Sequence, residues 1–308
     1  MKTRVTPLLL FALVLTTWCS QAQEIDQDKL LHMRDSLDNL LVINPTASAI
    51  LVKKGELELY SFNTFLTSTQ FNDKNGTNAN LTGKQLLFNS LFQVNYGLSR
   101  NRRVNLGVDV NFRAYRYDID KSSKVLSLFQ DNPGNKTAVS YVGPRLRFQP
   151  FRRIRNFTYQ SYVWLPVGPK ENQVALGSSK VNWGNTFFFY KYFTDKLGFF
   201  SQLNFALAFP SANSETGAKT EFYLPISVSL SYVLTRKDLL FGTLSYSWTN
   251  IDISKISEGA DSDFAQYGLG YQHLFSKRFF VNASYTGTLM ARNYGKWSGA
   301  NVCLRYVF

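Results

Sequence analysis

The chain has few side chains suited to catalysis, and its two histidines are the first to consider. His32 lies in a segment with helical periodicity, and His273 lies in the stretch YQHLFS at 271–276. A serine hydrolase needs a hydroxyl beside an imidazole, with a third group that orients the ring. The position two residues after His273, which a strand would place on the same face, holds Phe275. The sequence therefore predicts that the protein is not an enzyme, with a lipid-modifying enzyme as the weaker alternative.

Metal and cofactor chemistry also lack a pattern in the sequence. A metal site needs several His, Cys, Asp or Glu residues at ligand spacing, but here two isolated histidines accompany scattered carboxylates. Cys303 is the only cysteine after residue 22, so an intramolecular disulfide is not expected. We expect no metal and no cofactor.

Arginine is the charged residue whose spacing carries information. Arg113, Arg145, Arg147 and Arg305 each follow an apolar neighbour in a segment of alternating character, and Asp109 shares their parity. Alternation places successive side chains on opposite faces of a strand. If these strands close into a barrel in a membrane, the polar set faces the lumen.

Two interpretations of these lumen residues stay open. An excess of arginine over Asp109 would attract anions, and Arg113 and Arg145, on successive strands, would lie near each other at one constriction. Alternatively, the arginines pair with Asp109 and with acids from the loops and fill a closed interior. A barrel of about twelve strands leaves little free bore once side chains fill it.

The last segment, WSGANVCLRYVF at 297–308, indicates which kind of barrel to expect. Phe308, Tyr306 and Leu304 alternate with smaller or polar residues, and the chain ends on the aromatic side chain. This pattern resembles the C-terminal signature of bacterial outer-membrane β-barrel proteins. The resemblance implies that these three residues form the insertion signal, which the barrel-assembly machinery reads, and that this segment is the closing strand.

The same alternation recurs along the chain and predicts an all-β fold: an antiparallel up-and-down transmembrane barrel, with a short N-terminal helix. Twelve strands are expected, with ten as the alternative because the first and sixth alternate poorly. The expected strands are 56–70, 85–98, 103–118, 138–151, 157–167, 182–193, 198–210, 220–235, 239–253, 264–274, 279–291 and 297–308.

Connection lengths predict the orientation of this barrel. Short, basic turns are expected at 99–102, 152–156, 194–197, 235–238 and 276–278, and long loops at 71–84, 119–137, 168–181, 211–219, 254–263 and 292–296. In outer-membrane barrels short turns face the periplasm and long loops face outward. Basic turns would also suit anionic lipid headgroups.

The N-terminal part predicts export. Residues 1–22 have a basic start, an apolar core and a small-x-small cleavage site, which indicate a Sec signal peptide. Residues 23–55 are expected to form a periplasmic or plug segment with a helix over 24–42, and residues 56–308 the barrel. The formal net charge of +13 does not point to nucleic acid, because no basic helix or aromatic RNA-binding motif accompanies it. We expect the Gram-negative outer membrane as location and its lipids as partners.

A second resemblance concerns function. The stretch VGPRLRFQPF at 142–151, followed by Gln160-Ser161 and Leu165-Pro166, is similar to elements of transporter-like outer-membrane barrels, and among named groups to the meta-pathway phenol-degradation family. That likeness implies passive uptake of small molecules and no catalytic residues. The expected function is therefore a porin-like channel or transporter for small solutes, anion-leaning or for small organic molecules. A structural barrel with a filled lumen is the alternative.

Overall fold

The computed structural model describes residues 50–120, 124–130, 134–151, 154, 156–173, 175–211, 214, 218–258 and 261–308. The chain divides into two units, Met1–Leu40 and Leu41–Phe308, and every described residue belongs to the second. The predicted signal peptide at 1–22 and the helix at 24–42 lie outside the described residues. Within the described part, no helix is both long and apolar enough to cross a membrane.

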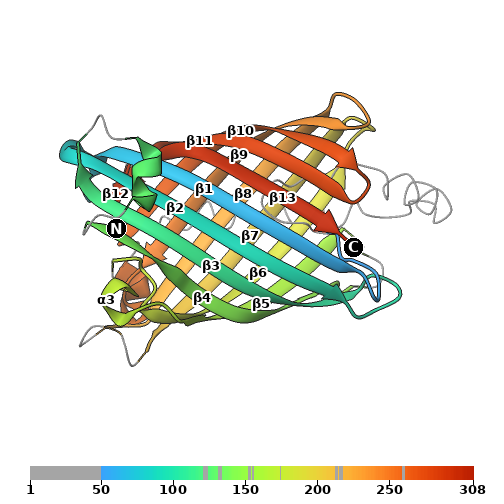
Figure 1. Ribbon diagram of the computed structural model, residues 1–308, viewed down its shortest axis with the longest axis horizontal. Helices are drawn as coiled ribbons and strands as arrows, with labels where there is room; N and C mark the ends of the chain where they lie inside the picture. The colour runs from blue at the N-terminus through green and yellow to red at the C-terminus, as the bar shows by residue number, and fades with distance from the viewer. Residues whose placement is uncertain are drawn as a thin grey trace. The chain divides into compact units, whose positions relative to one another are not determined.

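The described residues form a closed antiparallel barrel of twelve long strands (Figure 1). The strands are β1 (Leu57–Asn72), β2 (Asn78–Gly97), β3 (Val104–Ile119), β4 (Asn135–Phe148), β5 (Phe157–Pro166), β6 (Lys180–Tyr192), β7 (Leu197–Pro210), β8 (Glu221–Val233), β9 (Asp238–Asn250), β10 (Ser262–Ser276), β11 (Phe279–Arg292) and β13 (Ser298–Val307). The short β12 (Tyr294–Gly295) also pairs with β1 and continues the line of β13. The all-β fold and the count of twelve are confirmed, and the alternative of ten strands is wrong.

Closure depends on the first and last strands. β1 pairs with β2 on one side and with β13 on the other, in a register that sets Leu59 opposite Tyr306 and Phe65 opposite Ala300. Gly299 permits this approach, because a Cβ there would lie 1.8 Å from the carbonyl oxygen of Phe65. The segment at 297–308 therefore contains the closing strand, as the resemblance implied.

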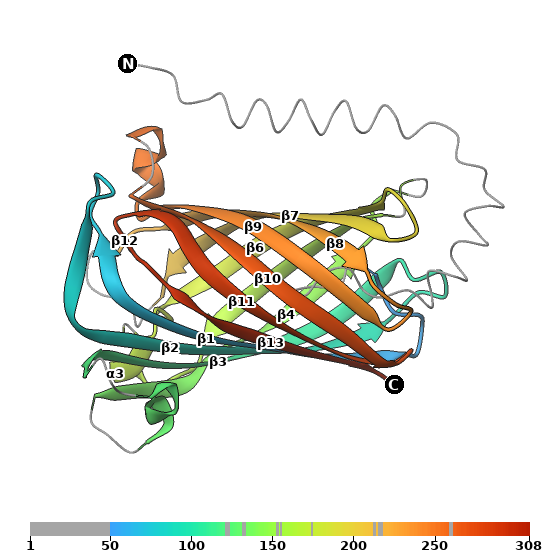
Figure 2. The same ribbon diagram turned by 90° about the horizontal axis from the view of Figure 1, so that it is seen from above.

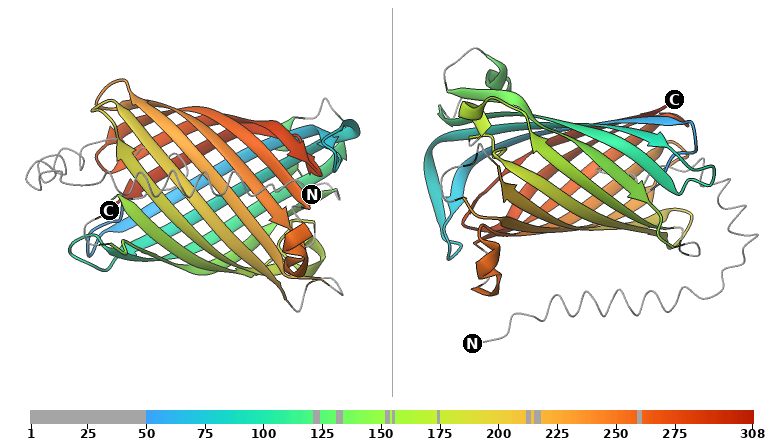
Figure 3. Two further views of the ribbon diagram at one scale, coloured as in Figure 1. Left: turned by 180° about the vertical axis from the view of Figure 1, so that it is seen from behind. Right: turned by 90° about the horizontal axis from the view of Figure 1, so that it is seen from below.

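The two ends of the barrel differ (Figure 2). One end, here called the loop end, carries the 3-10 helices η1 (Val125–Phe129) and η2 (Ile253–Glu258) and the short helix α3 (Lys170–Gln173). The other, the turn end, carries the C-terminus and the short connections between strands. Figure 3 shows from behind that the strands run obliquely between these ends.

One predicted loop is instead a strand pairing. The sequence pattern placed a long loop at 71–84, but β1 and β2 continue through it and are joined by a turn at 73–77. Gly76, with φ +83°, provides the left-handed conformation that the turn requires. The extension is rich in Asn and Thr, so its strands lack the apolar alternation by which strands were recognised.

The polarity of the outer and inner faces of the sheet is the reverse of that in a water-soluble protein. Large apolar side chains project outward and are exposed, such as Leu269 at 65% and Leu289 at 57%. Polar side chains project inward and are buried, such as Asn95 and Gln272, both at 0%, beside inward aromatic side chains such as Tyr60 and Phe280. Near the loop end η1 packs on the outer face, where Leu128 covers Leu86. An apolar exterior is the arrangement that a lipid environment requires of a barrel.

Candidate functional site: the charged lumen

All five predicted lumen residues lie on the inner face of the barrel. Asp109 and Arg113 belong to β3, Arg145 and Arg147 to β4, and Arg305 to β13. Each stands in the register beside another inward residue; Arg147, for example, pairs with Gln160 of β5. The structure divides the five into two groups along the barrel.

Glu58 is the centre of the group near the turn end. One carboxylate oxygen, Oε1, lies 2.7 Å from both Nε and Nη2 of Arg305. The other oxygen accepts from Asn95 at 3.0 Å and faces Nη1 of Arg147 at 3.5 Å. Glu58 is fully buried, so this carboxylate offsets the charge of two buried arginines.

Glu58 was missed by the sequence reasoning, which counted Asp109 as the only inward carboxylate. β1 alternates poorly, because Ser61 and Asn63 lie on its outer face while Phe62 lies on its inner face. The pairing of β1 with β13 could have placed Glu58. β13 alternates clearly, and Arg305 on its inner face is directly opposite Tyr60. Glu58 is two residues before Tyr60 and therefore shares its face.

Asp109 forms the second pairing of this group. Its Oδ1 lies 2.7 Å from Nη2 of Arg145, and its Oδ2 accepts from the indole N–H of Trp164 at 2.8 Å. Arg145 and Asp109 are each 1% exposed. Burying such charges is favourable only when they are paired and hydrogen-bonded, and the Asp109–Arg145 pair meets the first condition.

Some donors of the two β4 arginines are not used by the chain. Within the described residues, Nε and Nη1 of Arg145, and Nε and Nη2 of Arg147, have no hydrogen-bond partner. The group near the turn end contains three arginines and two carboxylates, so it retains one net positive charge. We call Glu58, Asp109, Arg145, Arg147 and Arg305 the paired cluster.

Arg113 lies apart from the paired cluster, and the expectation that it adjoins Arg145 is wrong. In the β3–β4 register Arg145 is opposite Gly107, whereas Arg113 is opposite Ala138. Six residues of β3 separate the two levels, which corresponds to about 20 Å at roughly 3.3 Å per residue. Neighbouring strands in the sequence were identified correctly, but only the register fixes which residues share a level.

The surroundings of Arg113 hold its guanidinium in one orientation. Nη1 donates to the carbonyls of Leu176 and Gly177 at 2.8 and 3.2 Å, and Nε donates to Asn89 at 3.2 Å. The guanidinium carbon lies 5.4 Å from the ring centroid of Tyr141. The loop that follows α3 thus folds inward to contact this arginine.

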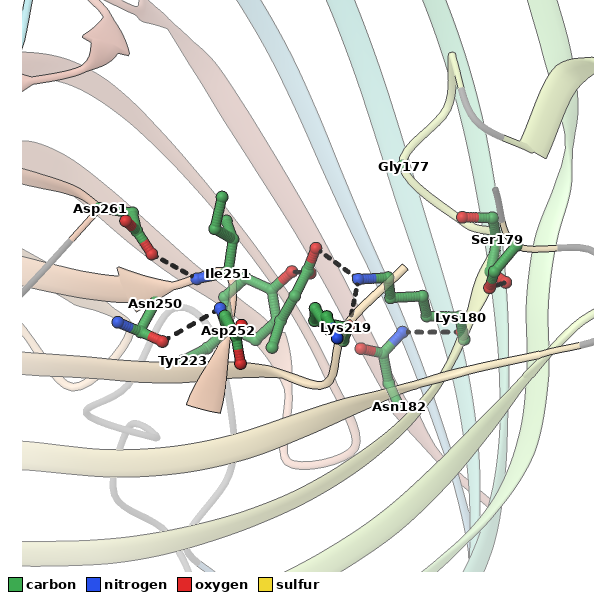
Figure 4. Close-up of polar contacts among 12 residues, drawn as sticks. Gly177, Ser179, Lys180, Asn182, Lys219, Tyr223, Asn250, Ile251, Asp252 and Asp261 are labelled. Carbon is green, nitrogen blue, oxygen red and sulfur yellow. Dashed lines mark hydrogen bonds and ion pairs between the residues drawn. The ribbon is translucent and has the colours of Figure 1, made fainter. Parts of the chain in front are cut away.

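A cavity of about 650 Å³ lies at the loop end, and two of its lining residues, Tyr141 and Gly177, contact Arg113. Its wall includes Tyr141, Lys180, Glu221 and Tyr223. Lys180 donates to Glu221 at 2.8 Å and to the carbonyl of Lys219 at 2.6 Å, and Tyr223 also donates to Glu221. Figure 4 shows the ammonium group of Lys180 directed toward Lys219, with Tyr223 on the same side of the cavity.

The residues that precede β1 pack inside the turn end of the barrel. Val52 is buried, and Asn105, with its amide oriented to satisfy both groups, accepts from Val52 N at 3.0 Å and donates to Val52 O at 3.2 Å. Gly97 lies so close that a Cβ there would stand 1.8 Å from the carbonyl oxygen of Lys53. The last residues of the expected plug segment at 23–55 therefore pack against the inner wall.

His273 lies on the outer face at the turn end. Its Nδ1 is 2.7 Å from Oδ1 of Asp238. The hydroxyls of Tyr271 and Thr235 both donate to Asp238 as well. The carboxylate partner was not anticipated from the sequence. Because the hydroxyls of Tyr271 and Thr235 donate to Asp238, they are poorly placed to act as nucleophiles activated by the imidazole of His273.

The three residues expected as an insertion signal lie on the outer face. Leu304, Tyr306 and Phe308 are 38%, 40% and 56% exposed. The rings of Tyr306 and Phe308 are 4.6 Å apart. The described residues contain no group of three or more His, Cys, Asp or Glu side chains placed to hold a metal ion.

Comparison with known proteins places the fold. No family model matches the sequence, and no curated protein matches it. Among solved structures, the barrel is similar to an outer-membrane channel from Pseudomonas putida F1, with a TM-score of 0.61, 12% identity, and coverage of 86% of this chain and 98% of the other. It is also similar to the β domain of the Bordetella autotransporter BrkA, with a TM-score of 0.52, 10% identity, and coverage of 83% and 100%. At these identities the likeness is one of fold.

Proposed function

We propose that the protein is a passive channel for small solutes in the bacterial outer membrane. The observation that carries the proposal is the closed barrel with an apolar outer face and a charged inner wall. A barrel of this kind satisfies its backbone groups internally and presents apolar side chains to lipid. The fold shared with the Pseudomonas putida channel supports the same assignment.

The charges on the inner wall favour anions as solutes. Four arginines face the carboxylates Glu58 and Asp109, which leaves a net charge of +2 (4 − 2) among these six residues, while Lys180 and Glu221 of the loop-end cavity pair with each other and add no net charge. Fixed positive charge in a narrow conduit with low-dielectric walls attracts anions and repels cations. The resemblance to the phenol-degradation family supports small organic molecules as the class of solute.

Export and insertion complete the proposal. Residues 1–22 act as a Sec signal peptide, and the barrel-assembly machinery recognises the outward aromatic end of β13, with Phe308 and Tyr306. The lipids of the outer membrane then surround the apolar face. Loss of the outer-membrane fraction on deletion of residues 2–22 would support this route, and unchanged delivery would refute it.

Conductance in planar bilayers tests the channel. The purified protein should form steps of conductance whose reversal potential, in a tenfold KCl gradient, indicates preference for chloride. Arg113→Gln should move that potential toward cation preference, while Arg236→Gln, in a turn outside the lumen, should leave it unchanged. The shift should shrink at 1 M salt, where the Debye length is about 3 Å. Cation preference of the unmodified channel would refute the assignment.

A structural barrel with a filled lumen is the second candidate, and the paired cluster favours it. Arg145 and Arg147 are nearly inaccessible at 1% and 2% exposure, so other groups fill the space around them on their side of the barrel. A filled barrel would insert into bilayers without any conductance steps. Steps in the unmodified protein would exclude this candidate.

A further inference from the structure

A groove of about 750 Å³ lies on the outer face of the barrel, across β8, β9, β10, β11 and β13. Two rows of directly paired, outward residues line it. One row consists of Leu197, Tyr232, Leu240, Tyr271, Ala283 and Val302, and the other of Leu230, Gly242, Leu269, Tyr285 and Ala300. Leu230 and Leu269 are 54% and 65% exposed, so the groove opens to the outside of the barrel and not to the lumen.

The groove exists because small residues stand beside large ones in these rows. Gly242, Ala283 and Ala300 leave space above the backbone, whereas their paired neighbours include leucine and tyrosine. Tyr271 is directly opposite Ala283 and could cover it. The hydroxyl of Tyr271 instead donates to Asp238, which lies nearer the turn end, so the ring is held away from the groove floor.

The groove runs from the turn end toward the middle of the barrel. Leu197 is the first residue of β7, whereas Val302 precedes the end of β13 at Val307 by five residues (307 − 302). The strands cross the barrel obliquely (Figure 3), so a row of paired residues also climbs obliquely from the turn end. None of the described residues that line the groove carries a charge. An acyl chain entering at the turn end would therefore contact apolar side chains along its length.

Four exposed cations lie at the turn end of the same strands. Arg236 and Lys237 belong to the turn before β9, and Lys277 and Arg278 form the turn between β10 and β11. The carbonyl of Lys237 accepts from a β10 N–H at 2.8 Å, and that of Arg278 from a β13 N–H at 2.9 Å, so both turns adjoin strands of the groove. Within the part of the chain that the structure describes, these four side chains form no hydrogen bond or ion pair.

The acids of this region do not cancel the four cations. Asp238 offsets one of them, and it is already engaged by three neighbouring side chains. When the main-chain carboxylate of Phe308 is counted as well, and His273 is taken as neutral, two positive charges remain (4 − 2). Asp195 and Lys196, in the turn before β7, offset each other. The apolar groove is thus bordered at the turn end by a net positive charge.

We propose that this sector binds one anionic phospholipid, with an acyl chain in the groove and the phosphate beside the four cations. The site rests on the proposed function, because it requires lipid around the barrel and headgroups at the turn end. Surrounding lipid is as apolar as the groove, so the hydrophobic effect does not retain the chain there. Retention comes from van der Waals packing in the groove and from attraction of the phosphate by the basic turns.

A second copy of the barrel fits the groove less well than a lipid does. Two copies in one membrane share their orientation, and a two-fold interface would place the same patch of each against the other. The four cations of one copy would then face those of its neighbour, and like charges across an interface are unfavourable. The charge that attracts a phospholipid therefore opposes a dimer through this groove.

Native mass spectrometry of the full-length mature protein in detergent, titrated with dioleoyl phosphatidylglycerol, tests the site separately from conductance. One molecule should bind saturably, and dioleoyl phosphatidylcholine, with the same chains and no net charge, should bind about fivefold more weakly. Arg236→Gln with Lys277→Gln should weaken phosphatidylglycerol by on the order of tenfold. Arg236→Gln alone should weaken it by a smaller factor, and Arg100→Gln, the same substitution in the turn between β2 and β3, should leave it unchanged.

Gly242→Phe tests the groove itself. A Cβ at Gly242 would lie 3.6 Å from Cδ2 of Leu269, an ordinary contact, so the added ring enters the groove without displacing the strand. The substitution should weaken both lipids by about fivefold through lost packing. Val108→Phe adds a ring to the outer face of β3 and should change neither affinity. Heat-modifiable gel migration shows that each variant is folded.

The outcomes separate this site from the channel. Equal binding of the two lipids overturns the site, and so does unchanged phosphatidylglycerol affinity in the folded Arg236→Gln, Lys277→Gln variant or in folded Gly242→Phe. Displacement of phosphatidylglycerol by glycerol 3-phosphate also overturns it, because that result indicates a simple anion site without a role for the groove. A dimer that retains no lipid does the same. Chloride-preferring conductance without phosphatidylglycerol preference leaves the channel standing and removes the site, and phosphatidylglycerol binding without conductance does the reverse.

Discussion

Glu58→Gln is the substitution from which the structure predicts the largest single effect on the barrel. The carboxylate receives two contacts from Arg305 at 2.7 Å, one from Asn95 at 3.0 Å and one from Arg147 at 3.5 Å. A glutamine in the same place keeps one acceptor oxygen but turns an amide donor toward groups that are themselves donors. Two buried guanidinium groups then lose their counter-charge.

The magnitude follows from the burial. Removing one partner of a buried ion pair costs about 3–5 kcal/mol, because an uncompensated charge remains inside. Glu58 is fully buried and Arg147 is 2% exposed, so solvent screening reduces this cost little. We expect the free energy of unfolding to fall by about 3 kcal/mol, the lower end of that range, because Arg147 Nη1 lies at the long distance of 3.5 Å.

Urea unfolding in lipid vesicles, followed by tryptophan fluorescence and by heat-modifiable migration, measures the change. Asp195→Asn removes the same charge from an exposed turn at the same end and should stay within about 0.5 kcal/mol of the unmodified protein. Glu58→Gln combined with Arg305→Gln should recover part of the loss, since the double substitution removes an unpaired charge. Equal stability of Glu58→Gln and Asp195→Asn would refute the role of Glu58 as the centre of the cluster.

Three further predictions follow from single positions. Gly97→Ala should displace the segment at Lys53, because its Cβ would stand 1.8 Å from that carbonyl oxygen, and protease cleavage before β1 should increase; an unchanged cleavage pattern would contradict this packing. Deletion of Phe308 should lower the outer-membrane yield and leave periplasmic aggregate, and normal yield would count against the insertion signal. The hydroxyl of Ser254 lowers the pKa of Asp252, so the loop stabilisation it provides is present at neutral pH and is lost as pH falls through that lowered pKa. Ser254→Ala should therefore raise the pKa of Asp252 toward its ordinary value in an NMR titration, and an unchanged titration would remove this explanation.

The strands were predictable because lipid imposes the alternation on the sequence. Strands such as β3 and β11 present apolar residues outward and polar residues inward, so apolar residues recur at every second position of their sequences. The constraint ends where the strands leave the lipid. The β1–β2 extension through 73–77 needs no apolar face, and for that reason its composition was interpreted as a loop.

Contacts across the lumen were less predictable than the strands. Parity placed Arg113, Arg145 and Arg147 on the inner face, but a face does not determine a level along the barrel. Levels depend on register, and the register is set by the closing pair of β1 with β13 and by irregularities such as the one at Asn111–Phe112. The partnership of Glu58 with Arg305 joins the two ends of the barrel sequence, and local periodicity in β1 does not reveal it.

The division of the arginines changes where selectivity should arise. In the paired cluster two carboxylates offset three guanidinium groups, and the pairs hold β1, β3, β4 and β13 to one another. Arg113 has no carboxylate partner among the described residues; carbonyl and amide oxygens hold it, and these do not cancel its charge. The field of a paired charge falls off faster with distance than that of a single charge. Arg145 and Arg147 are almost fully buried, whereas Arg113 is partly exposed, so an anion in the lumen would respond most strongly to Arg113. Substitutions in the paired cluster should act mainly on stability, and substitutions at Arg113 mainly on permeation.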